Sequence, residues 1–522
     1  MCELIRKILH NTTQSPSNNK PTPNAPRTLQ TLKSTVAHAV AKGTIANTPY
    51  DRKAYVVNLA IQDIGMGRYQ WQLFALCGFG WFADNFWIQG VALTLNALSD
   101  VFGVGMTGVR YTTLSLFVGL CVGASFWGVT SDVVGRRLAF NCTLGFAGVF
   151  GVLAGVVRSW VGVCAMFACV GVGIGGNLPV DGALFLEFLP SESANYLTML
   201  SVWWPVGQLV GSLIAWPLLV NYKTDGWRYL LYTMGGMTLI GFVVRVFVFE
   251  LFESPKYLLA RGRQAESATV IRGLAYKNGQ QTWLTEEVLN AIGGHPDATS
   301  DGKLSTSEIV RRNLSKFSTQ RVGPLFATTK LGLTTLLIWI CWTAIGMGYP
   351  LFNAFLPQYL SQAGGSAASS DYITYRNYAI TSVVGVPGSI AACWLVKIPG
   401  FGRRGTMALF TVVTGVFLFC FTVSADPDYQ LVFSSLEALV QNVAYGVLYA
   451  YTPEVFPAPV RGTASGISSF LNRLAGLCAP VIAVNTASAD PKAPIYASGA
   501  LFLIAFLAMI SLPIETNRRQ MM

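Results

Sequence analysis

The sequence predicts an all-α membrane protein with twelve transmembrane helices in two six-helix bundles that are pseudo-repeats of each other. Of the 522 residues, 52% are hydrophobic and only 12% are charged, and the mean hydropathy is +0.46, whereas soluble domains carry roughly 25% charged residues. Twelve apolar stretches are long enough to cross a bilayer core, which needs about twenty residues per helix. Short motifs also recur at equivalent places in the two halves of the chain.

The chain begins with a polar segment, residues 1–69, which is rich in Pro, Ser, Asn and Thr over NTTQSPSNNKPTPNAP. Such a composition buries little apolar surface, so we expect a disordered cytoplasmic tail. The segment also lacks the apolar core of a signal peptide.

The twelve spans follow in two sets of six, each bounded by Gly, Pro or charge. The first bundle, residues 70–253, has spans at 70–95, 110–130, 138–157, 160–187, 197–220 and 229–252. A cytoplasmic linker, residues 254–330, contains QAESATVIRGLAYKNG and TEEVLNAIGG, whose spacing favours short amphipathic helices. The second bundle, residues 331–514, has spans at 331–356, 374–396, 405–424, 429–452, 463–485 and 494–513, and residues 515–522 form a short cytoplasmic tail.

The basic residues predict the orientation of these spans. Translocated loops are depleted in Lys and Arg, and 28 of the 36 basic residues lie on the side that holds both termini and the linker, against six on the other side. Both termini are therefore expected in the cytoplasm, and the plasma membrane is favoured over an internal one. The formal net charge of +11 then reflects topology and attraction to anionic lipid, and we expect no nucleic-acid partner.

Two short loops on the cytoplasmic side repeat each other. GVTSDVVGRR at 128–137 follows the second span, and KIPGFGRR at 397–404 follows the eighth. Gly128 and Gly135 permit a tight turn, Asp132 can lie against a helix N-terminus, and two arginines hold the turn at the inner leaflet. This motif indicates a cytoplasmic latch or gate, although the arginines could serve topology alone. The latch candidates are Gly128, Asp132, Gly135, Arg136, Arg137, Glu187, Arg403, Arg404, Glu454 and Arg461.

These motifs resemble those of a known family. GVTSDVVGRR resembles the loop signature of the major facilitator superfamily, and YTPEVFPAPVRGTASG, FESPKYLLARGRQAES and LPIET resemble stretches of sugar porters and of their synaptic-vesicle-glycoprotein-like relatives. The run GNLPVDGALFLEFLP is closer to the fungal organic-solute branch, and Val133 and Lys397 depart from the usual loop pattern. The resemblance implies the major facilitator fold, with linker helices that tie the halves together.

The first span contains FADNFWIQG, which places the ionisable residue Asp84 at membrane depth. An acid there is costly unless it is protonated, paired or facing a water-filled cavity, so it is a functional candidate by default. The resemblance implies that the first helix lines the central cavity, where sugar porters place a proton-coupling Asp. Asp84 is the first candidate for proton coupling and Glu437 in the tenth span the second, while a structural role for Asp84 stays open.

Further polar and aromatic residues fall in the helices that line the cavity of this fold. Amides donate and accept hydrogen bonds and aromatic rings pack an apolar face, which suits a neutral hydroxylated or aromatic solute. About half of these residues are expected to serve only helix packing. Arg245 is expected to snorkel to the interface, and Asp181 is assigned to gating. The cavity candidates are Asn85, Trp87, Gln89, Gln208, Tyr349, Asn353, Gln441 and Asn442.

Together these features predict a secondary transporter that works by alternating access, with proton-coupled symport of a sugar-like or small organic solute. One alternative is efflux of a drug or secondary metabolite, although GQLVGSLIAWP lacks the full antiporter pattern; another is a transporter-like nutrient receptor. The sequence contains no HExxH, GxSxG or P-loop motif, so no catalytic motif indicates an enzyme. The ten cysteines show no CxxC pair, so we expect no metal and no cofactor, and we take the chain as a monomer.

Overall fold

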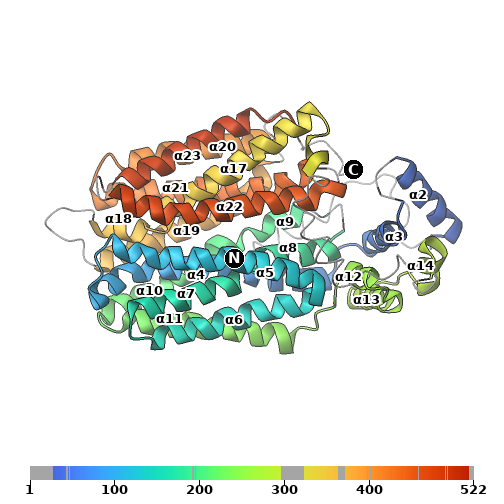
Figure 1. Cartoon of the computed structure of the whole chain (residues 1–522), viewed down its shortest axis with the longest axis horizontal. Helices are drawn as coiled ribbons and strands as arrows, with labels where there is room; N and C mark the ends of the chain where they lie inside the picture. Colours follow the sequence, from blue (N-terminus) through green and yellow to red (C-terminus); the bar gives the residue numbers. More distant parts are fainter. Residues whose placement is uncertain are drawn as a thin grey trace.

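A computed structural model of the chain describes most of its residues, namely 27–42, 45, 47–190, 193, 195–295, 322–362, 371–396, 398, 402–456, 458–487, 490 and 492–515. All regular secondary structure in these residues is helical. Figure 1 shows the long helices side by side, with the first half of the chain in the lower layer and the second half in the upper one. Short helices lie beyond one end of this bundle. We call that end the linker end and the opposite end the distal end.

The first half supplies six spans, and the fourth and the fifth are each divided into two helices. The fourth span breaks at Gly176, just before Pro179, whose missing N–H weakens helical continuity. The sixth span ends in a π-helical turn at Val244–Val248. The helices are α4 (Arg68–Phe102), α5 (Tyr111–Val134), α6 (Arg136–Val156), α7 (Trp160–Gly175) with α8 (Asn177–Phe188), α9 (Asn195–Leu200) with α10 (Trp203–Asn221), and α11 (Gly226–Val243).

The second half supplies the other six spans. Pro350 lies near the end of its first helix, which turns at Ala354 into a short continuation. The helices are α17 (Thr329–Asn353) with α18 (Leu356–Gln362), α19 (Asp371–Leu395), α20 (Gly402–Phe421), α21 (Pro427–Val455), α22 (Ala458–Ala487) and α23 (Ala493–Ile510). Among the described residues, 11 helices are long and apolar enough to cross a membrane. The twelfth span is α4, whose apolar run is interrupted by Asp84 and Asn85, and the predicted twelve-helix fold is confirmed.

The expectation of a disordered segment over 1–69 is wrong for its second part. Helices α2 (Leu29–Ala41) and α3 (Pro49–Ile64) form there, and α3 begins with the cap residue Thr48 followed by Pro49 at its first position. Val56, Val57 and Ile61 are fully or almost fully buried in α3, because their spacing puts them on one face of the helix. The polar composition of the segment as a whole hid this pattern. Residues 1–26 lie outside the described part of the chain.

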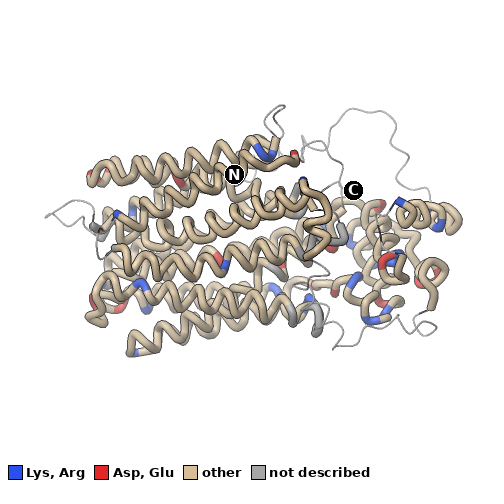
Figure 2. The backbone as a smooth tube through the Cα atoms, turned by 45° about the horizontal axis from the view of Figure 1, so that its top comes forward, with Lys and Arg blue, Asp and Glu red and all other residues tan. Residues whose placement is uncertain are grey.

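The linker contains the two short helices that its sequence predicts, α13 (Gln264–Lys277) and α14 (Glu286–Gly293), preceded by α12 (Pro255–Ala260). They pack with α3 into a linker-end module, where Lys53 Nζ donates to the Gly294 carbonyl at 2.7 Å. Asn278 Nδ2 donates to Gln70 Oε1 at 2.8 Å and so ties the module to the start of α4. Figure 2 shows that charged residues gather in this module, whereas the middle of the bundle carries few.

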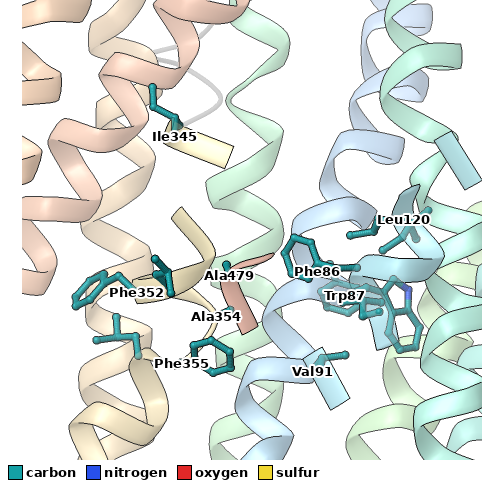
Figure 3. Packing of buried hydrophobic residues seen from close by; sticks show 14 of the residues in the cluster. Phe86, Trp87, Val91, Leu120, Ile345, Phe352, Ala354, Phe355 and Ala479 are labelled. Atoms are coloured by element: carbon teal, nitrogen blue, oxygen red, sulfur yellow. The ribbon is translucent and has the colours of Figure 1, made fainter. Parts of the chain in front are cut away.

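The hydrophobic core runs through both halves of the bundle. Figure 3 shows Phe86 and Trp87 of α4 near Leu120 of α5, with Phe352 and Phe355 of the second half on the other side. All of these side chains are almost completely buried. The polar side chains between the halves are therefore surrounded by an apolar shell.

Candidate functional site

A cavity of about 100 Å³ lies between the two halves of the bundle. Helices α4, α5, α8 and α10 of the first half and α17, α21 and α22 of the second half contribute to its wall. Its polar side chains include Asp84, Asn85, Gln208, Gln441, Asn442, Asn472 and Arg473, and its aromatic ones are Phe117, Trp204, Tyr349, Tyr445 and Tyr449. Six of the ten cavity and coupling candidates named from the sequence, Asp84 among them, thus line one space.

Asp84 lies in the wall of this cavity on α4. Its side chain is 3% exposed, and its Oδ1 atom has no hydrogen-bond partner among the described residues. The carboxyl group interacts with the Asn177 side chain and electrostatically with Arg473. Asn177 in turn donates from Nδ2 to the Gly80 carbonyl at 3.2 Å. An acid that is buried but not fully bonded can change its proton occupancy without breaking a network, which suits a coupling residue.

Three polar side chains join the two halves across the cavity. Gln208 Nε2 donates to Asn85 Oδ1 at 3.1 Å and to the Tyr349 hydroxyl oxygen at 2.6 Å. The Tyr349 hydroxyl donates to Asn85 Oδ1 at 3.2 Å. Asn85 and Gln208 belong to the first half and Tyr349 to the second, so these bonds must change when the halves move apart or when a solute competes for them.

Glu437 lies behind the cavity wall on α21. It is fully buried, and Gln441 Nε2 donates to its Oε1 atom at 2.6 Å. Asn353 Nδ2 donates to Gln441 Oε1 at 3.2 Å, so Gln441 connects Glu437 and Asn353 to the cavity that it lines. Asn442 lines the cavity, while its Nδ2 donates to the Ala438 carbonyl at 2.8 Å.

The structure does not bring Trp87 or Gln89 to the cavity. Trp87 lies in the core of the first half, where Nε1 donates to Thr238 Oγ1 at 3.1 Å, and Figure 3 shows its ring on the side of α4 away from Phe352. Gln89 is buried facing Gly211 of α10. With a turn of about 100° per residue, Gln89 points about 140° away from Asp84 around the helix. The apolar run of α4 concealed which of its faces meets the cavity.

The first of the two predicted latch motifs, at the linker end, is assembled around two glutamates. Arg136 Nε pairs with a Glu187 carboxylate oxygen at 2.8 Å. The Glu253 carboxylate accepts hydrogen bonds from the backbone N–H groups of Arg136 at 3.0 Å and Arg137 at 3.3 Å, so it caps the N-terminus of α6. Gly135 has a φ of 124°, a conformation that favours glycine, and starts this helix.

The second motif repeats the same plan. Arg403 pairs with Glu454, and Glu515 accepts from the backbone N–H groups of Arg403 at 3.0 Å and Arg404 at 3.1 Å. The sequence analysis did not single out Glu253 or Glu515. Each of them follows the last span of its half, Glu253 within FESPKYLLARGRQAES and Glu515 within LPIET. Gly128 lies in α5 with open space beside it. The side chains of Asp132 and Arg461 lie outside the described residues.

Arg245 does not snorkel to the interface as expected. Its side chain is 1% exposed and pairs through Nη2 with Asp181 Oδ2 at 2.9 Å. Its guanidinium also donates to the carbonyls of Phe140 and Leu76 at 2.8 Å each and lies over the Phe140 ring. The π-helical turn that holds Arg245 belongs to a sixth span that packs on α4 and α6, and a partner acid inside the bundle removes the need to reach water.

Arg473 falls within the predicted span 463–485, but no sequence motif assigns it a role. The side chain lines the cavity from α22, and its Nη2 atom is buried with no hydrogen-bond partner among the described residues. Tyr445 and Tyr449 were also missed, although they follow Gln441 at intervals of four residues on one face of α21. Trp204 stacks on Trp81, with ring centroids 4.7 Å apart, and meets Tyr449 at the same distance.

A buried arginine closes the distal side between the halves. Arg110, just before α5, donates from Nε to Gln358 Oε1 at 3.0 Å and from Nη1 to the Ala483 carbonyl at 2.8 Å. Its guanidinium lies 5.0 Å from the Phe355 ring centroid. All three partners belong to the second half, so the distal ends of the halves are joined. On the linker side of Asp84, Trp81 stacks on Trp204, and Tyr449 of the second half meets the Trp204 ring edge on.

Comparisons with known proteins agree with this architecture. The sequence profile of the Major Facilitator Superfamily matches residues 74–426 and 377–520. MFS siderochrome iron transporter 1 of Ceriporiopsis subvermispora (strain B) is 44% identical over 483 residues, which cover 90% of this chain and 92% of that protein. Major facilitator-type transporter hxnZ of Emericella nidulans is 41% identical over 498 residues, covering 91% and 89%.

The solved structures that resemble the chain include the xylose transporter XylE from E. coli. Its partially occluded inward open conformation superposes with a TM-score of 0.64 at 14% identity, over 86% of this chain and 99% of that chain. A second structure, described as the proton:xylose symporter XylE bound to 6-bromo-6-deoxy-D-glucose, gives a TM-score of 0.62 at 18% identity, over 86% and 96%. At these identities the likeness establishes the fold.

Proposed function

The chain belongs to the Major Facilitator Superfamily, so it is a membrane transporter of small-molecule solutes, and we propose that it moves a small organic solute together with a proton. The observation that carries this proposal is Asp84, a buried acid in the wall of the central cavity whose Oδ1 atom has no hydrogen-bond partner among the described residues. Proton coupling requires a group at the solute site that changes its proton occupancy during the cycle. Asp84 is an ionisable group in the cavity wall and is therefore the first candidate for this role, and Glu437, one hydrogen bond behind the wall, is the second.

The proposed cycle is alternating access, in which the halves move about the solute. The bonds of Asn85 and Gln208 with Tyr349 and those of Arg110 with Gln358 cross between the halves, so they form and break as the cycle proceeds. The Arg136–Glu187 and Arg403–Glu454 pairs lie within one half each and hold the linker-end turns of that half. Each six-helix half would then move as a rigid body.

We also propose that both termini and the linker lie in the cytoplasm and that the protein acts in the plasma membrane. The support for the orientation is the charge asymmetry, since 28 of the 36 Lys and Arg residues lie on the side of the termini and the linker. A sugar-like solute agrees with the fold shared with a xylose transporter, and other small organic solutes agree with the amides and rings of the cavity.

The test uses the variant Asp84→Asn in proteoliposomes. Labelled D-xylose and benzenesulfonate, which stays charged and does not leak through lipid, are first screened for uptake by the wild-type protein under an inward proton gradient. An amide mimics the protonated acid but cannot change its proton occupancy, and a gradient drives a solute only if proton occupancy favours one state of the cycle. We therefore expect Asp84→Asn to retain solute exchange in a counterflow assay and to lose accumulation driven by the gradient.

The matched control is Asp100→Asn, the same change at an exposed position of α4, which should accumulate solute like the wild type. A variant Asp84→Asn that still accumulates solute uphill would exclude Asp84 as the coupling residue and shift the test to Glu437→Gln. Loss of exchange and accumulation together would assign Asp84 a structural role.

A further inference from the structure

The central cavity contains a guanidinium donor whose hydrogen-bonding capacity the described residues do not satisfy. Nη2 of Arg473 is buried in the cavity wall, and no described residue accepts a hydrogen bond from it. A buried donor left without an acceptor is costly, and more so when it is charged. Arginine presents a planar fork of donors that matches a carboxylate or a sulfonate in geometry. The unfilled donor therefore points to a ligand that brings its own negative charge.

The other charged groups near Arg473 do not satisfy this donor. Asp84 interacts with Arg473 electrostatically but makes no hydrogen bond to it. Asp181 is already paired with Arg245 in the first half, and Glu437 accepts from Gln441 behind the wall. Among the described residues, the remaining titratable groups near Asp84, Arg473 and the cavity are the phenols of Tyr349, Tyr445 and Tyr449 and the thiol of Cys121. With Asp84 ionised the cavity is close to neutral, and with Asp84 protonated it carries the positive charge of Arg473.

The walls beside Arg473 suit a flat, apolar body. Tyr445 and Tyr449 stand on one face of α21, with ring centroids 6.1 Å apart, and Trp204 meets Tyr449 nearly edge on at 4.7 Å. Such rings bury planar apolar groups well. Asn442 and Asn472 supply amides at the edge of the same space. The cavity combines one anion anchor with an aromatic wall.

We propose that the solute is a small organic anion with a planar body, whose carboxylate or sulfonate group binds Arg473 while its ring packs on the tyrosines of α21. This inference rests on the proposed function, because it names the solute class of the same cavity. The Asp84 carboxylate and the ligand anion compete for the positive charge of Arg473. Protonation of Asp84 removes the competitor, so the anion and the proton bind together, and one monoanion with one proton crosses without net charge.

The experiment measures binding to purified full-length protein in lipid nanodiscs, by calorimetry or tryptophan fluorescence. The probes are benzoate and benzenesulfonate, which are anions near neutral pH, and benzamide, which has the same ring without the charge. Binding avoids the leak of neutral benzoic acid through lipid, and benzenesulfonate stays charged throughout. We expect wild-type protein to prefer benzoate to benzamide by roughly tenfold or more, the value of one charge-assisted hydrogen bond.

The variant Arg473→Gln should weaken benzoate binding by roughly tenfold to a hundredfold and leave benzamide binding unchanged. Unchanged benzamide binding shows that Arg473→Gln is folded, and Arg473→Lys should restore part of the preference for the anion, because charge is the cause. Benzenesulfonate should bind wild-type protein more weakly as the pH rises through the titration of Asp84. In Asp84→Asn its affinity should be high and independent of pH.

Three results would overturn the anion site: equal affinity for benzoate and benzamide, a preference that survives in Arg473→Gln, or no saturable binding of either anion at millimolar concentration. Failure of proton coupling has a different signature. In that case Asp84→Asn would still accumulate solute under a proton gradient, while the Arg473-dependent preference for the anion would remain.

Discussion

At the scale of single residues, the first half depends on an ion pair that is sealed inside it. Asp181 is 0% and Arg245 1% exposed, and the pair lies against the backbone of α4 at Gly80. Only a residue without a side chain fits there, because a Cβ on Gly80 would lie 1.6 Å from Asp181 Oδ2 and 2.6 Å from Arg245 Nη2. The Asp181–Arg245 pair therefore occupies the space that a side chain at position 80 would need. This position lies one helical turn before Asp84.

The variant Gly80→Ala tests this close contact. The added methyl group must push the ion pair or the helix aside, so we expect a loss of about 1–3 kcal/mol in stability, measured as a lower midpoint of thermal unfolding in detergent. The control is Gly236→Ala on α11, where a Cβ would meet nothing within 4 Å. Removing a helical glycine there should stabilise by about 0.5–1 kcal/mol. Equal effects of the two changes would contradict the contact.

Sequence patterns revealed some of the site residues and hid others for a physical reason. Asp84 stands out because a lone acid in an apolar run is rare, whatever its partners are. Arg245 and Arg473 are equally rare, but their roles depend on what the neighbouring helices bring to them: Arg245 meets Asp181, whereas Arg473 meets a cavity. Partners that are 64 residues or more apart in the chain cannot be found from spacing within one helix.

At the scale of elements, the two halves repeat one device for starting a helix. Glu253 caps α6 and Glu515 caps α20, each through two backbone N–H groups at the Gly-Arg-Arg turn. Each glutamate follows the last span of its half, so the cap fastens the third span to the end of the sixth. The repeated loops were evident in the sequence. Their acidic partners were not, because each lies more than 110 residues away.

Helix α3 shows how element prediction fails in a polar segment. Its buried face packs on the linker helices, and Asp63 near its end accepts from Arg27 at 2.7 Å and from Trp283 Nε1 at 2.9 Å. Burial of Lys53 in this module lowers the pKa of its amino group. The twelve spans were predictable because each is apolar by itself. Helix α3 is stable only against α13 and α14, and sequence composition does not reveal such a partner surface.

Two lysine substitutions in α3 test whether its buried face holds the helix in the linker-end module. Val57→Lys places a charge at a position that is 0% exposed, so α3 should leave the module and residues 49–64 should exchange their amide hydrogens much faster. Asn58→Lys adds the same residue at the neighbouring exposed position and should leave the exchange unchanged. Protection that persists in Val57→Lys, read by hydrogen exchange with mass spectrometry, would show that α3 does not need this contact.

At the scale of the whole molecule, the contacts between the halves define the state of the cycle. Tyr349 bonds to Gln208 and Asn85 between the halves, Arg110 joins the distal ends, and the rings of Trp204 and Tyr449 meet towards the linker end. Contacts between the halves thus lie on both sides of the cavity.

The last prediction concerns the distal closure, where Gln358 is completely buried and bonds both to Arg110 and to the Met106 carbonyl. Gln358→Ala removes the acceptor of a charged donor, which costs the closed state about 1.5–3 kcal/mol, so the fraction of molecules open at the distal end should rise tenfold or more. Spin labels at Asp100 and Asp428, on exposed distal positions of the two halves, should report a longer distance in a background without reactive cysteines.

Gln280→Ala, the same change at an exposed linker-end position, should leave the distance distribution as in the wild type. Because Arg110 keeps its bond to the Ala483 carbonyl, the double variant with Arg110→Ala should open further. An unchanged distance in both variants would mean that the aromatic packing of Phe355 and Tyr359, rather than the arginine, holds the distal ends together.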